Sequence, residues 1–378
     1  MDDTREFSTV ERMLLDSAQK NRVSANGSIE LLPLCNMNCD MCYVRLSREE
    51  MERQGRLRTA EEWLEIGRQM QAAGVLLLLL TGGEPLLYPG FKELYLGLKQ
   101  LGFILSINTN GTLIDEDWAD FFAAHKPRQM NITLYGVSDD TYASLCHYPG
   151  GYTKTIRAIR LLRERGIEVR MSATIGKTNR QDLPAILKLG DELNITVQCD
   201  TYLMPGERER TLPFDRQARL SPEQAAAARV EFLRWRAGDD LFRQYVQQSV
   251  QRARQAPEGP AEPGRMTCMA GSCSFTINWQ GEMRPCVILS EPAVSVFEVG
   301  FEAAWKYIVE ETDKILLNAK CSTCHMRHLC RTCAASALLE TGSYDGVPDY
   351  MCRYAEESLR LLREEWEKIQ DGQDISDR

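Results

Sequence analysis

Residues 29–42, IELLPLCNMNCDMC, join a short apolar run to three closely spaced cysteines. The apolar part, 29–34, has the length and composition of a buried β-strand. Cys35, Cys39 and Cys42 follow it directly, and the run has no nearby fourth ligand. Three thiolates on a cubic iron–sulfur cluster leave one iron without a protein ligand, so such a run offers an open metal position where chemistry can start.

Short apolar runs alternate with longer amphipathic ones up to about residue 204. The predicted strands are 29–34, 75–80, 103–108, 130–134, 167–175 and 196–202. One predicted helix begins at Thr59, where Glu62 completes a capping box, and two others span 152–165 and 182–193. Six strand–helix units imply parallel strands with right-handed crossovers. They predict an α/β fold with a partial, TIM-like (β/α)6 barrel, and a doubly wound open sheet is the alternative.

The polar motifs favour the barrel. The motif TGGEP (81–85) follows the second strand and NTNGT (108–112) follows the third, just as the cysteines follow the first. In βα barrels the functional groups gather in loops at the carboxyl ends of the strands, so these three motifs are expected to meet.

Composition limits the function classes. The chain has 378 residues, 43% of them apolar, and a net charge of −9. An acidic chain is a poor nucleic-acid binder, its apolar runs are too short to cross a membrane, and its polar N-terminus lacks a signal sequence. We therefore expect a cytoplasmic protein with neither nucleic-acid nor membrane partners, in which the clustered cysteines bind metal rather than form disulfides.

The C-terminal cysteines make two sets of four, which suits two fully ligated metal centres. They are Cys268, Cys273, Cys286, Cys321, Cys324, Cys330, Cys333 and Cys352. Zinc is the alternative metal for this half, because thiolates suit both and His325 and His328 lie inside the motif. Cys146 and Cys199 stand apart and are interpreted as small buried hydrophobic residues.

The chain divides into five predicted segments. They are an N-terminal extension (1–27), a partial barrel (28–205), a helical bridge and linker (206–265), a small cysteine-rich domain (266–352), and a C-terminal helix and tail (353–378).

The three-cysteine run, TGGEP and NTNG (108–111) together resemble the radical S-adenosylmethionine (SAM) superfamily, and the C-terminal cysteines resemble its iron–sulfur SPASM extension. In that extension a cysteine, a spacer and Gly-x4-Cys precede a Cys-x2-Cys-x5-Cys-x3-Cys run and a last cysteine. Gly281 and Cys286 fit this pattern. Cys333 departs from it, because it follows Cys330 after two residues and not three.

The resemblance implies three 4Fe–4S clusters. Cys35, Cys39 and Cys42 would hold the catalytic cluster, whose open iron binds the amino and carboxylate groups of SAM. The first auxiliary cluster would use Cys268, Cys273, Cys286 and Cys333. The second would use Cys321, Cys324, Cys330 and Cys352.

The residues expected around SAM are Tyr43, Gly82, Gly83, Glu84, Asn108 and Thr133. The two glycines let the backbone approach a ligand closely, and Glu84 supplies a carboxylate near the cofactor's ammonium group. The alternative is that these residues have only structural roles, as parts of a turn or as polar residues at strand ends. The candidates for a catalytic base or hydrogen donor are Asp200, Tyr202 and Tyr135, for which structural roles also stay open.

The implied chemistry is reductive cleavage of SAM to a 5′-deoxyadenosyl radical that takes a hydrogen atom from a substrate. SPASM relatives mostly crosslink or oxidise ribosomally made peptides or proteins, so peptide maturation is the expected function. Radical oxidation or rearrangement of a small molecule, such as a sugar alcohol or tetrapyrrole, is the alternative, and a non-catalytic metal protein is a third. Val287 stands where anaerobic sulfatase maturases carry Asp, which argues against formylglycine formation.

The resemblance also implies partners. A ferredoxin or flavodoxin would supply the electron. Peptide maturases with a built-in leader-binding winged helix have a longer N-terminal part than the 28 residues found before the first strand here. A separate leader-peptide-binding protein, or another surface of this chain, would then recognise the leader.

Overall fold

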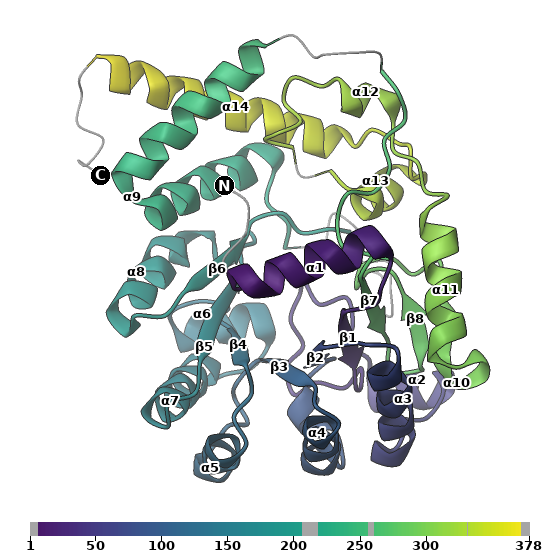
Figure 1. Ribbon diagram of the computed structural model, residues 1–378. Coiled ribbons are helices and arrows are strands. Elements are labelled where there is room, and N and C mark those ends of the chain that lie inside the picture. Colours follow the sequence, from purple (N-terminus) through teal and green to yellow (C-terminus); the bar gives the residue numbers. More distant parts are fainter. Residues whose placement is uncertain (1–6, 206–217, 256–260, 331, 372–378) are drawn as a thin grey trace.

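The computed structural model describes residues 7–205, 218–255, 261–330 and 332–371. At its centre lie six parallel strands (Figure 1). They are β1 (Asn26–Glu30), β2 (Leu77–Thr81), β3 (Ile104–Thr109), β4 (Gln129–Thr133), β5 (Val169–Thr174) and β6 (Val197–Asp200). Their order in the sheet is their order in the sequence. A doubly wound sheet reverses its strand order at a switch point, so that alternative is wrong and the partial-barrel prediction is confirmed.

Helices cover the outer face of these strands. They are α3 (Ala60–Ala72), α4 (Phe91–Gln100), α5 (Glu116–Ala124), α7 (Gly151–Glu164) and α8 (Leu183–Leu193). This part of the chain also forms α2 (Arg48–Gln54) and α6 (Asp139–Cys146), whose buried residues belong to smaller apolar clusters, and short 3-10 turns at Pro85–Leu87 and Arg180–Asp182. The predicted capping box is present: Thr59 and Glu62 each accept the other's backbone amide. The predicted helices at 152–165 and 182–193 correspond to α7 and α8, so all three helix predictions are confirmed.

Strands β3 to β6 are mostly polar on the inner face of the barrel and apolar on the outer face, whereas β2 contributes Leu79 to the interior. In β3, Leu105 and Ile107 are buried against the helices, whereas Ser106 and Asn108 line internal cavities. The same period of two recurs in β4, β5 and β6. Because side chains alternate between the faces of a strand, each of these four strands contributes to the apolar core and to a mostly polar interior at once.

The first predicted strand, 29–34, is displaced, because β1 already ends at Glu30. The chain nevertheless stays extended against the segment that follows β2. The amide of Leu31 donates to the carbonyl oxygen of Thr81 at 2.9 Å, and the amide of Gly83 donates to that of Leu32 at 2.7 Å. A Cβ atom at Gly83 would lie 2.2 Å from the carbonyl oxygen of Leu34. Position 83 therefore requires glycine, because any side chain there would collide with the backbone of Leu34.

The C-terminal region joins the same sheet. Strand β7 (Ser274–Ile277) pairs in parallel with the free edge of β1, and β8 (Glu282–Arg284) and β9 (Val294–Ser295) extend the sheet antiparallel. The sequence predicted a cysteine-rich unit after a linker but not this shared sheet. The pairing of β1 with β7 joins residues about 250 positions apart, a separation at which local patterns carry no information.

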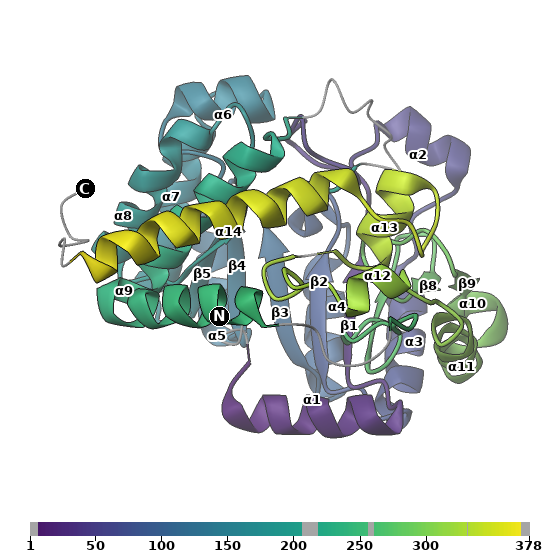
Figure 2. The ribbon, with the colours of Figure 1, turned by 90° about the horizontal axis from the view of Figure 1, so that it is seen from above.

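Four further helices belong to the C-terminal region: α10 (Val296–Val299), α11 (Phe301–Thr312), α12 (Ala319–Ser322) and α13 (Ala334–Thr341). The predicted bridge contains α9 (Pro222–Arg254), which is kinked at Gly238, and α9 packs along α14 (Asp349–Gln370) in both ribbon views (Figures 1 and 2). Residues 206–217 and 256–260 of the predicted bridge and linker lie outside the described residues. No described helix is long and apolar enough to cross a membrane.

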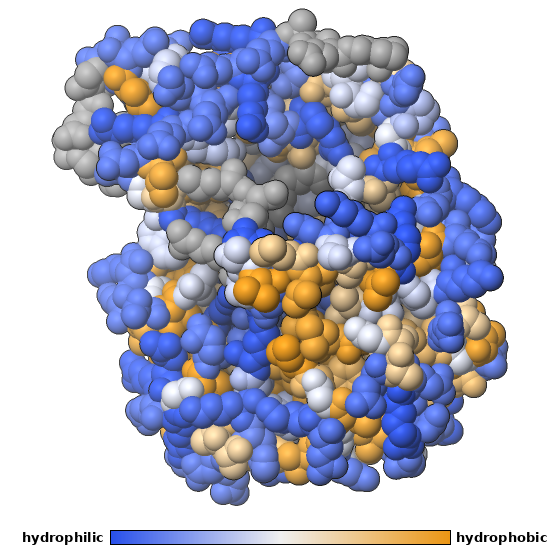
Figure 3. Space-filling model, viewed as in Figure 1, coloured by the Kyte–Doolittle hydropathy of each residue, from blue (hydrophilic) through white to orange (hydrophobic). Residues whose placement is uncertain are grey.

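The N-terminal extension contains a helix, α1 (Thr9–Asn21), that the sequence analysis did not predict. Glu11 pairs with Arg128 at 2.7 Å, just before β4, and the indole nitrogen of Trp305 donates to the carbonyl oxygen of Arg22. These contacts fix α1 across the sheet. Its solvent side carries the exposed Val10 and Met13, and Figure 3 shows hydrophobic surface in this part of the face.

The contact between Gly83 and Leu34 yields a first prediction. Gly83→Ala should lower the free energy of unfolding by about 2 kcal/mol, because the new methyl group overlaps a backbone carbonyl that is itself hydrogen-bonded. Chemical unfolding followed by circular dichroism measures this. Gly264→Ala is the control, since its methyl group meets nothing within 4 Å. Equal losses in the two variants would contradict the prediction.

Candidate active site

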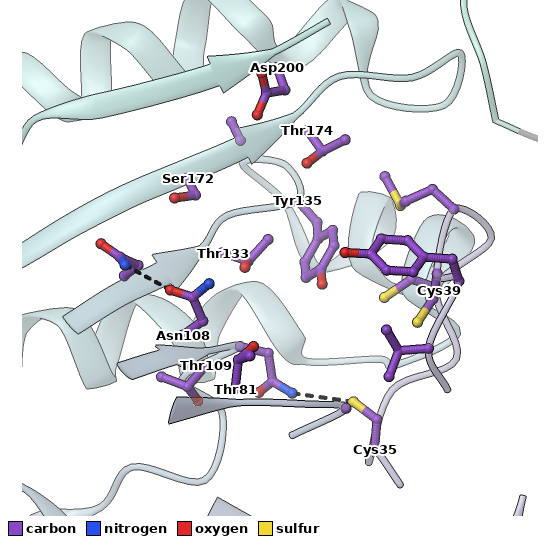
Figure 4. Close-up of a pocket in the computed structure, with 18 of the residues that line it drawn as sticks. Cys35, Cys39, Thr81, Asn108, Thr109, Thr133, Tyr135, Ser172, Thr174 and Asp200 are labelled. Carbon is purple, nitrogen blue, oxygen red and sulfur yellow. Dashed lines mark hydrogen bonds between the residues drawn. The ribbon is translucent and has the colours of Figure 1, made fainter. Parts of the chain in front are cut away.

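A cavity of about 620 Å³ lies at the carboxyl ends of the strands. The last residue of each strand from β2 to β6 lines it, and Figure 4 shows these side chains facing the cavity from successive strands. These residues are Thr81, Thr109, Thr133, Thr174 and Asp200. The sequence motifs predicted that functional groups would meet at the strand ends, and the structure places them there.

The loop after β1 forms the opposite wall of the cavity. Cys35, Cys39 and Cys42 all line it. The amide of Met37 donates to Cys35 Sγ at 3.4 Å, and the amide of Arg45 donates to Cys42 Sγ at 3.3 Å. Amide donors of this kind stabilise negative charge on sulfur, so the loop is shaped for thiolate ligands.

Asn110 joins this loop to β3. Its side-chain amide donates to Cys35 Sγ at 3.7 Å and to the side-chain oxygen of Asn36 at 2.9 Å. Figure 4 draws the contact with Cys35 as a dashed line. The sequence analysis quoted the motif containing Asn110 but selected Asn108, the last residue of the predicted third strand.

Cys146 is brought against Cys39 by the fold. Its thiol is hydrogen-bonded to Cys39 Sγ, and this contact lowers the pKa of Cys39 and raises that of Cys146, where burial adds to the increase. Cys35 differs, because burial, joined by the charges of Glu84 and the other two cysteines, raises its pKa to about 12. Cys146 is buried as expected, but the interpretation as a mere hydrophobic residue was incomplete. Cys199 does lie in the main apolar core.

Glu84 occupies a different position from the one expected. It is fully buried and is not among the residues lining the cavity. Its carboxylate accepts hydrogen bonds from the Thr109 hydroxyl at 2.7 Å, the Asn110 amide at 2.9 Å and the Leu86 amide at 3.2 Å. Burial nevertheless raises the pKa of Glu84 to about 7. In this structure Glu84 organises the loop after β3 from behind the cavity wall.

The other residues expected around SAM do line the cavity. They are Tyr43, Gly82, Gly83, Asn108 and Thr133. The side-chain oxygen of Asn108 accepts a hydrogen bond from Asn131 at 2.7 Å. The glycines face the cavity on one side and the backbone of residues 31–34 on the other. Their lack of side chains thus serves the packing of the loop, in addition to any ligand.

All three catalytic candidates, Asp200, Tyr135 and Tyr202, also line the cavity. The Tyr135 hydroxyl contacts Cys39, and burial raises the pKa of Tyr135 well above its ordinary value. The Tyr202 hydroxyl donates to Glu340 at 3.0 Å, and Glu340 forms a buried ion pair with Arg219. Tyr202 therefore ties the end of the barrel to α13.

A second cavity of about 380 Å³ adjoins the first inside the barrel. Both are lined by Tyr43, Val44, Leu79, Thr81, Gly82, Asn108, Gln129 and Asn131. Cys286 and Val287 reach the second cavity, and Ile288 reaches the first. The C-terminal region thus contributes to the walls of the barrel interior.

The C-terminal cysteines fall into two electrostatic groups. Burial raises the pKa of Cys268 and of Cys286, and the charge of Cys333 adds to both increases. Burial likewise raises the pKa of Cys352, to which the charges of Cys330, Cys321 and Cys324 add. Among the His, Cys, Asp and Glu side chains of the described residues, no three converge closely enough to hold a single metal ion. A cubic cluster keeps its ligands further apart than a single ion does, so this finding concerns only mononuclear sites.

Comparisons with known proteins agree with this geometry. Residues 29–190 match the family model described as the Radical SAM superfamily. The chain is 24% identical over 326 residues to an AdoMet-dependent heme synthase of Methanosarcina barkeri, a match that covers 83% of this chain and 92% of that protein. It is 26% identical over 161 residues to the sporulation killing factor maturation protein SkfB of Bacillus subtilis, which covers 43% of this chain and 38% of that protein.

The fold is similar to that of Streptococcus suis SuiB bound to the precursor peptide SuiA. The TM-score is 0.65 at 17% identity, and the match covers 93% of this chain and 83% of that one. Residues 29–190 therefore form a radical SAM domain, and the chain has homologues among the SPASM-type radical SAM proteins.

Proposed function

We propose that Cys35, Cys39 and Cys42 bind the 4Fe–4S cluster and that the cavity beside them holds SAM and the reacting part of the substrate. One observation carries this proposal: three thiols of a single loop face polar residues from the strand ends across one cavity. When bound, the reduced cluster and SAM supply a 5′-deoxyadenosyl radical that takes a hydrogen atom from the substrate.

The chain's own residues orient these groups. The amides of Met37 and Arg45 hold two of the thiolates in place. The backbone at Gly82 and Gly83, with the side chains of Asn108, Thr133 and Tyr43, is proposed to contact SAM. Glu84 acts indirectly, because it fixes Thr109 and Asn110, and Asn110 in turn contacts Cys35.

The C-terminal cysteines are proposed to hold two auxiliary 4Fe–4S clusters. The first would use Cys268, Cys273, Cys286 and Cys333, and the second Cys321, Cys324, Cys330 and Cys352. The two electrostatic groups support this division and support Cys333 in the first set despite its altered spacing.

The proposed substrate is a ribosomally made peptide or protein, matured by crosslinking or oxidation. The cluster and SAM would share the cavity of about 620 Å³ with the reacting part of the substrate, and an inserted side chain needs less of that space than a macrocycle does. Relatives named for peptide maturation, such as SkfB, and the fold neighbour SuiB with its bound precursor peptide support this class.

The second candidate is oxidation of a small tetrapyrrole. The observation in its favour is the extent of similarity to the heme synthase, which reaches 83% of the chain, whereas the SkfB match spans only 43%. Production of 5′-deoxyadenosine coupled to consumption of a peptide from a neighbouring gene, or of a tetrapyrrole, distinguishes the two classes.

The cellular setting belongs to the same proposal. A ferredoxin or flavodoxin supplies the electron in the cytoplasm, and a separate protein presents the peptide leader. The acidic surface implied by the net charge of −9 gives no support for a nucleic-acid partner.

Cys39→Ala tests cluster binding. The variant should lose SAM cleavage and about a third of its iron, since one cluster of three is lost. Iron analysis and mass spectrometry of 5′-deoxyadenosine, with dithionite as reductant, measure both. Cys199→Ala is the matched control, because it removes another buried thiol, one that lies in the apolar core, and this variant should retain both SAM cleavage and the full iron content. SAM cleavage by Cys39→Ala at the wild-type rate would reject the proposal.

Asp200→Ala tests whether the side chain at the end of β6 acts on the substrate. Because Asp200 lies across the cavity from the cysteine loop, the variant should still cleave SAM but should convert substrate at least about tenfold more slowly. Separate quantification of 5′-deoxyadenosine and of product checks this. Full turnover by the variant would remove Asp200 from the candidates.

Glu84 should make stability depend on pH. The pKa of Glu84 in the folded protein is about 7, above the ordinary 4.5, because burial favours the protonated carboxyl group. The stabilisation of the folded state by protonated Glu84 is therefore fully present below pH 4.5 and is lost as the pH rises to 7. Across this window the wild type should lose up to about 3 kcal/mol relative to Glu84→Gln. Urea unfolding of the cluster-free proteins measures the difference. Glu61→Gln, at an exposed position, should run parallel to the wild type, and a parallel curve for Glu84→Gln would contradict the prediction.

A further inference from the structure

Cys146 is the last residue of α6, and this end of α6 holds the cysteine loop. The amide of Asn38 donates to the carbonyl oxygen of Cys146, and the amide of Asp40 donates to that of Leu145, both at 3.0 Å. These two amides flank Cys39 in the sequence. The final turn of α6 therefore fixes the backbone on both sides of the central cysteine of the loop.

The surroundings of the two thiols are apolar. Cys39 and Cys146 belong to one buried cluster with Met37, Tyr142 and Leu145. Within this cluster the Cys146 thiol is hydrogen-bonded to Cys39 Sγ, and the Tyr135 hydroxyl contacts the same sulfur. Where water is excluded, a hydrogen bond has a stronger electrostatic effect than it has at the surface.

We propose that Cys146 is a positioning residue that tunes the catalytic cluster: its thiol donates an S–H···S hydrogen bond to the cluster-bound sulfur of Cys39 and raises the reduction potential of that cluster. The inference rests on the proposed binding of the cluster by Cys35, Cys39 and Cys42. Hydrogen bonds to cluster sulfurs stabilise the more negatively charged, reduced state, and outer partners of this kind orient the ligand they contact.

Cys146 is thus assigned as a donor and not as a fourth ligand. Its thiol lies in the same buried cluster as Cys39. A cluster-bound Cys39 carries no proton, so Cys146 is the partner that can donate. The backbone carbonyl groups of Leu145 and Cys146 are meanwhile held by the amides on either side of Cys39. A ligand role predicts loss of iron when the thiol is removed, whereas a donor role predicts unchanged iron and a changed potential. The two roles are therefore separable by measurement.

The experiment is a redox titration of the anaerobically reconstituted full chain, followed by electron paramagnetic resonance. The signal that changes when SAM is added identifies the catalytic cluster. In Cys146→Ala the ratio of reduced to oxidised cluster at a fixed potential should fall about threefold, with iron content unchanged. Cys146→Ser keeps a donor and should remain close to the wild type. Cys199→Ala should leave the titration unchanged.

Several results would overturn the proposal. An unchanged midpoint in Cys146→Ala would do so, as would an equal shift in Cys146→Ser or a loss of iron in Cys146→Ala. If Cys146→Ala does not fold, Cys146→Val fills the site without a donor. This variant must then show the fall in the ratio of reduced to oxidised cluster that is expected for Cys146→Ala. Absence of any SAM-responsive signal in the wild type would instead reject the proposed function.

Discussion

The pairing of residues 31–34 with the segment after β2 is the contact on which the rest of the site depends. It continues the parallel ladder of β1 and β2 beyond both strands, through the hydrogen bonds from Gly83 to Leu32 and from Glu84 to Leu34. Cys35 is the next residue after this pairing. The ladder therefore determines where the cysteine loop starts, and glycine at 82 and 83 lets the two backbones approach closely enough to form it.

The two faces of the barrel strands have different roles: the outer face stabilises the fold, and the inner face lines the cavities. The outer residues join the helices in one apolar core, which supplies most of the hydrophobic stabilisation. The inner residues are mostly polar, and the polar ones gain little from burial. Some of them are satisfied by one another, as in the hydrogen bonds from Asn131 to Asn108 and from Ser28 to Thr276. Others stay directed at the cavities, where a ligand can use them.

The C-terminal region is bound into the same architecture by two links. Strand β7 extends the sheet at β1, and the Tyr202–Glu340–Arg219 group connects the end of β6 to α13. These links reach opposite edges of the six-stranded barrel. They bring Cys286 and Ile288 to the cavity walls, so the proposed first auxiliary cluster would lie beside the barrel interior. Such an arrangement suits an auxiliary centre that exchanges an electron with a substrate or holds it in place.

The sequence by itself determined the period-two strands, the capped helices, the parallel α/β fold and the residues that gather at the strand ends, because these follow from local patterns and from the rule that parallel strands end at one edge. It also pointed to all three cysteines of the loop. Only the tertiary structure decided that Glu84 lies behind the cavity wall, that Gly83 faces Leu34, that β7 pairs with β1, and that Cys146 meets Cys39. Each of these depends on contact between segments distant in the chain, and such contacts are set by packing and not by the local order of residues.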